Sequence, residues 1–92
     1  MKKNDIAIPA DPTDPEDFDV TMEGLDRGHR ARLVRQVRTK LGLTWQDFAA
    51  RFHVPLGTLR DWEQARVTVP DFAIAYIRVI RAHPDMVAEI VA

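Results

Sequence analysis

The chain has 92 residues, no cysteine and a formal net charge of -1. This length corresponds to one domain, and the lack of cysteine excludes disulfides, thiol catalysis and cysteine-ligated zinc and fits a reducing cytoplasm. Because no apolar run approaches the ~20 residues of a membrane span and no signal-peptide core follows Lys2-Lys3, we expect a cytoplasmic protein with no membrane partner.

The charge is distributed unevenly along the chain. Residues 1–30 carry four basic and eight acidic side chains, a net charge of −4, whereas residues 31–92 carry nine basic and six acidic ones, a net charge of +3. Attraction to phosphates depends on the local basic face of a protein rather than on its total charge. The near-neutral total is therefore no argument against DNA binding.

Three prolines, Pro9, Pro12 and Pro15, are interleaved with aspartates near the N-terminus. Such a segment cannot maintain a helix or a sheet ladder, and it has too few apolar side chains to fold alone. We therefore predict a disordered acidic arm over residues 1–28 and a folded domain over residues 29–92. The arm has two interpretations: a solvated tail that aids solubility, or a segment that orders on contact with a basic protein.

The first predicted helix spans residues 31–41. Its apolar residues recur at helical spacing, and its basic residues lie largely on the other faces. Gly42 follows at the position where helices commonly end in a left-handed conformation. The apolar positions of this helix are Leu33, Val34, Val37 and Leu41.

Residues 44–64 predict two short helices joined by a tight turn, the layout of a helix-turn-helix. Thr44 can cap the first helix, with Asp47 reaching back in a capping box. Pro55 disfavours helical backbone in the residue before it and suits the start of the second helix. That helix presents a polar outer face at its N-terminal end, as does the helix that enters the major groove of DNA. The inward-facing side chains, which we assign to the core, are Phe48, Ala49, Phe52, Leu59 and Trp62.

A further helix is predicted over residues 72–82, after Pro70-Asp71, and a last amphipathic segment over residues 86–91. The first of these two is apolar on most of its sides. Because one apolar stripe suffices to pack a small bundle, the surplus indicates a second buried surface, most simply a homodimer interface. The residues that we assign to this interface are Phe72, Tyr76, Ile77, Ile80, Met86 and Ile90.

Enzymatic sites are not indicated. The three histidines, His29, His53 and His83, are far apart in the sequence, and no pair has the spacing of metal ligands. No glycine-rich phosphate loop is present, and carboxylates on a flexible arm cannot hold a catalytic geometry. We therefore expect no catalysis, no metal and no cofactor.

The segment from about residue 34 to residue 70 contains a spaced set of motifs: Leu41-Gly42-Leu43-Thr44, Phe48-Ala49, Val54, Thr58-Leu59, Trp62-Glu63 and Pro70. This set resembles the Xre family of helix-turn-helix regulators, which implies an all-α, five-helix phage-repressor-like bundle. The run VPLGTLRDWEQ, with the basic loop and the helix pair after it, is similar to HigA-type antitoxins. That similarity implies a transcriptional repressor that regulates its own operon and neutralises a small basic, RNA-cleaving toxin of the RelE/HigB class.

The resemblance also implies contacts between individual residues and double-stranded DNA. Arg66, together with Arg51 or Lys40, would supply salt-dependent phosphate binding that positions the protein without specifying sequence. A dimer would read a palindromic operator with half-sites about one helical turn apart. The further DNA-binding positions are Leu56, Gly57, Arg60 and Asp61, which would face the bases, and Trp45, Gln46 and Thr58, which would face the phosphates.

Five residues have structural consequences under this resemblance. Arg38 and Glu63 match a pair that forms a buried or half-buried salt bridge, which would tie the first helix to the end of the recognition helix. His53 and Ala65 stand where the family commonly has glycine, so they are expected in left-handed turns that glycine adopts more cheaply. Trp45 replaces a glutamine that commonly contacts phosphate, although its indole N–H can still donate one hydrogen bond.

Two alternatives to the repressor and antitoxin remain open. The first is a protein-interaction module that has the helix-turn-helix shape but little DNA affinity, since Asp61, Glu63 and the acidic arm repel phosphate. The second is an Xre-type regulator without a toxin partner.

Overall fold

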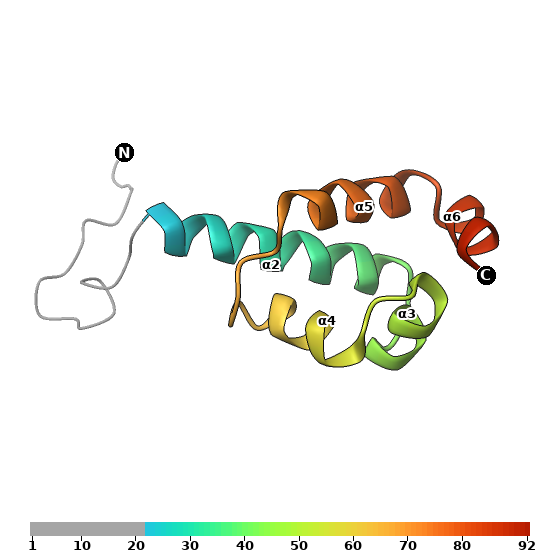
Figure 1. The fold of residues 1–92 in the computed structure, drawn as a ribbon, viewed down its shortest axis with the longest axis horizontal. Coiled ribbons are helices and arrows are strands. Elements are labelled where there is room, and N and C mark those ends of the chain that lie inside the picture. The colour runs from blue at the N-terminus through green and yellow to red at the C-terminus, as the bar shows by residue number, and fades with distance from the viewer. Residues whose placement is uncertain (1–21) are drawn as a thin grey trace, which may run out of the picture.

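The computed structural model describes residues 22–92, so the predicted disorder of residues 1–21 lies outside the described part of the chain. The described residues form five α-helices and no β-strand, which confirms the all-α class (Figure 1). The helices are α2 (Met22–Lys40), α3 (Trp45–Phe52), α4 (Leu56–Glu63), α5 (Asp71–Ala82) and α6 (Pro84–Val91).

Residues 22–28 belong to helix α2, so the predicted boundary between arm and domain at residue 28 was wrong. A glycine inside a helix costs only about 1 kcal/mol, and Gly28 therefore does not end the helix. Arg30 anchors this part of α2, because its Nε lies 3.0 Å from the Asp26 carboxylate one turn earlier. Its Nη1 also lies 2.8 Å from Asp71 of α5. The second contact is tertiary, so the local periodicity of the sequence did not indicate it.

The start of α3 and the connection between α3 and α4 have the predicted features. The Thr44 hydroxyl accepts a hydrogen bond from the backbone N–H of Asp47 at 3.1 Å, which confirms the N-terminal cap of α3. His53 adopts a left-handed conformation with a φ of 58°. Helix α4 begins directly after Pro55. Only three residues separate the two helices, so their relative orientation is set by a short and well-defined turn.

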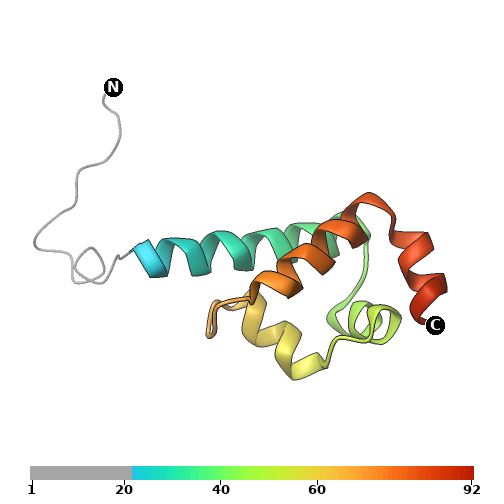
Figure 2. The same cartoon turned by 45° about the horizontal axis from the view of Figure 1, so that its top comes forward.

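The core lies where the five helices meet. Helix α2 lies between α5 and α4 (Figure 1), and α6 lies at the far end beside α3 (Figure 2). Phe52 and Trp62 are buried, as predicted, and the Phe48 and Phe52 rings pack with their centroids 4.8 Å apart. The largest fully buried side chains are Phe48, Phe52, Leu59, Ile77, Ile80, Val34 and Val69.

The proposed dimer interface needs a correction. Ile77 and Ile80 have no exposed surface within the single chain, because both face the core from α5, so they cannot contact a second copy. Tyr76 is half-buried, and its hydroxyl donates to the backbone carbonyl of Phe52 at 2.8 Å. The other predicted positions are exposed. The exposed apolar side chains on the two C-terminal helices are Phe72, Val79, Met86 and Ile90.

Candidate nucleic-acid interface

Four residues at helical spacing form one stripe along the outside of α4. Gly57, Arg60, Asp61 and Gln64 are separated by three, one and three positions, so they share one side of the helix. Together with Trp45 of α3 and Arg66 of the following loop, they line a surface hollow of about 350 Å³. The structure thus brings together five of the eight predicted DNA-binding residues: Trp45, Gly57, Arg60, Asp61 and Arg66.

The same hollow contains a residue that sequence reasoning missed. Gln64 directly follows α4 and was treated as the end of the motif. Its separation of four positions from Arg60 was the available signal, because this spacing keeps a side chain on the same helical side.

The remaining predicted positions lie elsewhere. Leu56 is half-buried and packs against the core, so it is less outward than expected. Thr58 lines a different, apolar hollow with Trp62 and Phe72. Gln46 is exposed on α3 and does not line the hollow.

Trp45 does not offer its indole N–H to a ligand. Its Nε1 donates to Oε1 of Glu63 at 3.0 Å, so the expected free donor for a phosphate is already occupied. The Trp45 ring instead contacts two arginines. The guanidinium carbon of Arg60 lies 5.1 Å from the ring centroid, and that of Arg38 lies 5.6 Å from it. Cation–π attraction of this kind favours an Arg60 side chain held over the ring at the edge of the hollow.

The Glu63 carboxylate holds the three helices behind this surface together. Its side chain is 2% exposed, and it accepts hydrogen bonds from Nε and Nη2 of Arg38 at 2.7 and 2.9 Å. This two-pronged geometry is the strongest form of arginine–carboxylate pairing. The predicted salt bridge is therefore confirmed. It links α2 to α4, and the Trp45 hydrogen bond adds α3.

Arg66 folds back onto the end of α4. Ala65 has a φ of 57°, the expected left-handed conformation, and the Arg66 N–H donates to the backbone carbonyl of Asp61 at 2.9 Å. The Arg66 guanidinium lies 3.7 Å from the Asp61 carboxylate. Both side chains are substantially exposed, and such a pair contributes only about 0–1 kcal/mol. Arg66 can therefore exchange Asp61 for a phosphate at low cost.

The other two arginine and lysine candidates for phosphate contact lie outside the hollow. Arg51 lines a depression with Leu43 and His53, and Lys40 lines a groove between α2 and α5. The cationic side chains at the hollow itself are Arg60 and Arg66.

Among residues 22–92, no helix is long and apolar enough to cross a membrane, and no cluster of histidine and carboxylate side chains has the arrangement of a metal site. No protein-family model, curated protein or solved structure matches the chain. The resemblance to Xre regulators accordingly rests on the motifs between residues 34 and 70.

Proposed function

We propose that the chain is a sequence-specific DNA-binding repressor in which α3 and α4 form a helix-turn-helix. Helix α4 is the recognition helix in this proposal. The observation that carries it is the exposed stripe of Gly57, Arg60, Asp61 and Gln64, which follows a tight turn and is backed by the buried Glu63 pair. A helix with such a stripe fits the width of the major groove of B-DNA.

The side chains of the stripe have the chemistry of base recognition. Arg60 can donate two hydrogen bonds to guanine O6 and N7, Gln64 can pair with adenine N6 and N7, and Asp61 can accept from the amino group of cytosine. Gly57 has no side chain, so it permits close approach of the α4 backbone to the bases. Each of these contacts requires its helix to keep a fixed orientation, which the Arg38–Glu63–Trp45 contacts provide.

A homodimer is part of this proposal. Four apolar side chains are exposed on α5 and α6, with between half and about three-quarters of each surface open: Phe72 76%, Val79 50%, Met86 53% and Ile90 73%. Contiguous exposed apolar surface commonly marks protein–protein contacts, and α5 and α6 pack against each other. A twofold dimer formed there would present two α4 helices to the two half-sites of a palindrome.

We also propose an antitoxin role, on the resemblance of residues 54–64 to HigA-type proteins. The partner would be a small basic toxin that cleaves RNA. The acidic character of residues 1–21, with six carboxylates and two lysines, supports a basic partner.

A protein-interaction module without DNA affinity is the second candidate. Asp61 favours it, because its carboxylate lies in the exposed stripe and repels phosphate. Glu63 no longer favours it, since that carboxylate is buried and paired with Arg38.

Selection from a library of randomised DNA duplexes separates the two candidates. We expect the full chain to enrich a palindrome whose half-sites lie about 10 base pairs apart, as two recognition helices of a dimer require. Failure to enrich any sequence over the starting library would contradict the repressor and favour the interaction module.

A further inference from the structure

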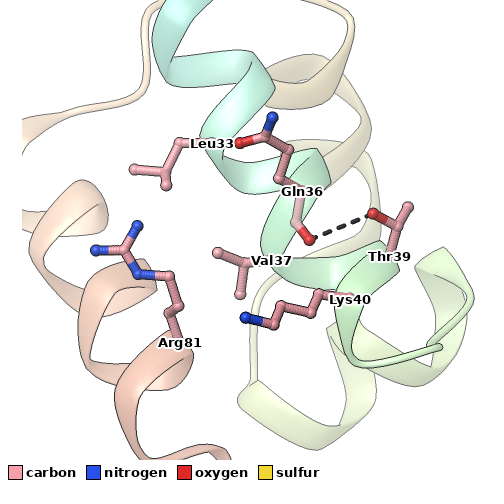
Figure 3. A pocket seen from close by; sticks show the side chains of 6 residues that line it. All are labelled: Leu33, Gln36, Val37, Thr39, Lys40 and Arg81. Carbon is pink, nitrogen blue, oxygen red and sulfur yellow. Dashed lines mark hydrogen bonds between the residues drawn. The ribbon is translucent and has the colours of Figure 1, made fainter.

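A long groove runs along the seam between α2 and α5, on residues that the proposed DNA contacts do not use. It consists of two adjoining hollows of about 460 and 210 Å³ that share Leu33. We name it the α2–α5 groove. The first hollow is lined by Leu33, Gln36, Val37, Thr39, Lys40 and Arg81 (Figure 3), and the second by Asp26, His29, Arg30, Leu33, Ile74 and Arg78.

The groove has an apolar floor between cationic walls. Figure 3 shows Lys40 of α2 and Arg81 of α5 extending toward the same space from opposite sides, with Val37 between them and Leu33 farther along α2. Arg78 adds a third cation in the adjoining hollow.

These three cations have no acidic partner among residues 22–92. Within residues 22–92, Lys40, Arg78 and Arg81 form no ion pair, whereas Arg30 in the same groove is paired with both Asp26 and Asp71. Uncompensated cations above an apolar floor fit an extended acidic segment that also carries apolar side chains.

The chain itself contains a segment of that composition. Residues 11–20 hold five carboxylates together with Phe18 and Val20, and no basic residue. One residue separates this segment from Met22, the first residue of α2, and the groove begins one turn after Met22 at Asp26.

The length of residues 11–20 also agrees with the length of the groove. From Asp26 to Lys40 the α2 axis rises about 21 Å, at ~1.5 Å per residue. An extended chain covers ~3.3 Å per residue, so about seven residues span the groove. Residues 11–20 are long enough to reverse direction before α2 and lie along it.

We propose that residues 11–20 dock in the α2–α5 groove of the same chain, with their carboxylates near Lys40, Arg78 and Arg81 and apolar side chains over Leu33 and Val37. This docking site is separate from the proposed DNA contacts, because the groove does not share a residue with the hollow beside α4. A basic partner protein would compete with the groove for the same acidic segment.

The absence of cysteine from the chain permits a direct test in the full-length protein. A nitroxide is attached to the single cysteine of an Ala10→Cys variant, and the amide signals of the isotope-labelled chain are recorded by NMR. We expect paramagnetic loss of intensity at Leu33, Gln36, Arg78 and Arg81. We also expect the loss to disappear at about 1 M salt, where the screening length falls to about 3 Å.

Charge reversal provides a matched control. Arg81→Glu should abolish the intensity loss in the groove, whereas Arg51→Glu should leave it unchanged. Both arginines are exposed and lie in the last turn of their helices, so each reversal has a similar effect on its helix dipole.

Three results would overturn the proposal. The first is the absence of intensity loss at the groove, and the second is an equal effect of the Arg81 and Arg51 reversals. The third is a loss that occurs only between chains, when nitroxide-labelled chains without isotope are mixed with isotope-labelled chains without nitroxide.

Discussion

At the residue scale, the buried carboxylate of Glu63 is the charge on which the stability of the fold depends most. The Glu63 carboxylate has almost no exposed surface, and its two oxygens are occupied by Arg38 and Trp45. Removal of one partner leaves a buried charge without compensation, and the free-energy cost of that exceeds the net gain from forming the pair. In the proposed DNA-binding function, Glu63 and Arg38 would therefore act through the orientation of α4, without contact with DNA.

Arg38→Ala should lower the free energy of unfolding by about 3–5 kcal/mol, as breaking a buried ion pair typically does. Arg66→Ala removes an arginine from the exposed pair with Asp61, and we expect a change of only about 0–1 kcal/mol. Urea denaturation of both variants measures the difference. Equal losses would mean that the Glu63 pair is no more important to folding than a surface pair.

A substitution at Gly57 tests DNA recognition separately from folding. A Cβ added at Gly57 meets no atom within 4 Å, and alanine favours a helix over glycine by up to about 1 kcal/mol. Gly57→Ala should therefore stabilise the fold slightly and weaken the proposed DNA binding, because the added methyl would lie where the proposal brings the α4 backbone close to the bases. Gly28→Ala is the matched control: its Cβ also meets nothing within 4 Å, and it lies on α2. If both variants keep full DNA affinity, close approach at Gly57 is excluded.

At the scale of the element, the turns at His53 and Ala65 contain local strain. Both residues have φ values near +57°, a region that costs a non-glycine residue roughly 1–2 kcal/mol. These two turns fix where α3 ends and how the loop after α4 leaves the helix. The two residues hold these conformations because the helices on both sides of each turn pack into the fold.

Ala65→Gly should raise the midpoint of thermal unfolding, because glycine adopts the left-handed conformation without strain. The expected net gain in stability is up to about 1 kcal/mol, after the larger conformational entropy of glycine in the unfolded chain is subtracted. Ala50→Gly, on the exposed side of α3, should lower the midpoint by a comparable free energy. Calorimetry on the two variants gives the signs. A lower midpoint for Ala65→Gly would show that strain relief does not exceed the entropic cost.

The sequence predicted which helices form better than it predicted where they begin and end. Capping at Thr44, the break before Pro55 and the buried stripe through Phe52 are local signals, and all three were confirmed. The predicted first helix began at residue 31 whereas α2 begins at Met22, because a glycine inside a helix costs only about 1 kcal/mol and Gly28 does not end it.

The candidate site was predicted only where helical spacing determines exposure. Spacing identified Gly57 and Arg60 correctly as exposed residues of α4, and Asp61 is half-buried at the same hollow. It did not indicate that the Trp45 N–H would be taken by Glu63, because that contact depends on how α3 packs against α4. It assigned Ile77 and Ile80 to an interface because α5 is apolar on several sides, and spacing alone did not identify the side that faces the core.

At the scale of the whole molecule, the chain combines a basic domain with an acidic N-terminal segment. Residues 22–92 carry eleven basic and eight acidic side chains, whereas residues 1–21 carry two basic and six acidic ones. The excess positive charge of the domain favours phosphate binding, and the acidic segment opposes it. The exposed apolar side chains on α5 and α6 are where we expect a second copy of the chain to bind.

Phe72→Glu combined with Ile90→Glu should convert a dimer to a monomer. Both side chains are about three-quarters exposed, so the fold of the single chain should lose little stability. Sedimentation equilibrium of the variant and the wild type gives the masses. Val67→Glu is the control, because it changes an exposed apolar residue outside α5 and α6. A wild-type chain that is already monomeric would remove this interface from the account.

The most direct measurement is a titration of the full chain with the DNA immediately upstream of its own coding sequence, at two salt concentrations with unrelated DNA as competitor. We expect the chain to prefer the upstream DNA, with an affinity that falls steeply as salt rises. We also expect Arg60→Ala to lose about 1–3 kcal/mol of binding free energy, the usual value of a two-pronged base contact. Arg51→Ala, an exposed arginine outside the hollow, should leave the preference over competitor intact. Equal affinity for upstream and unrelated DNA, or an Arg60→Ala variant that binds as the wild type does, would contradict the account.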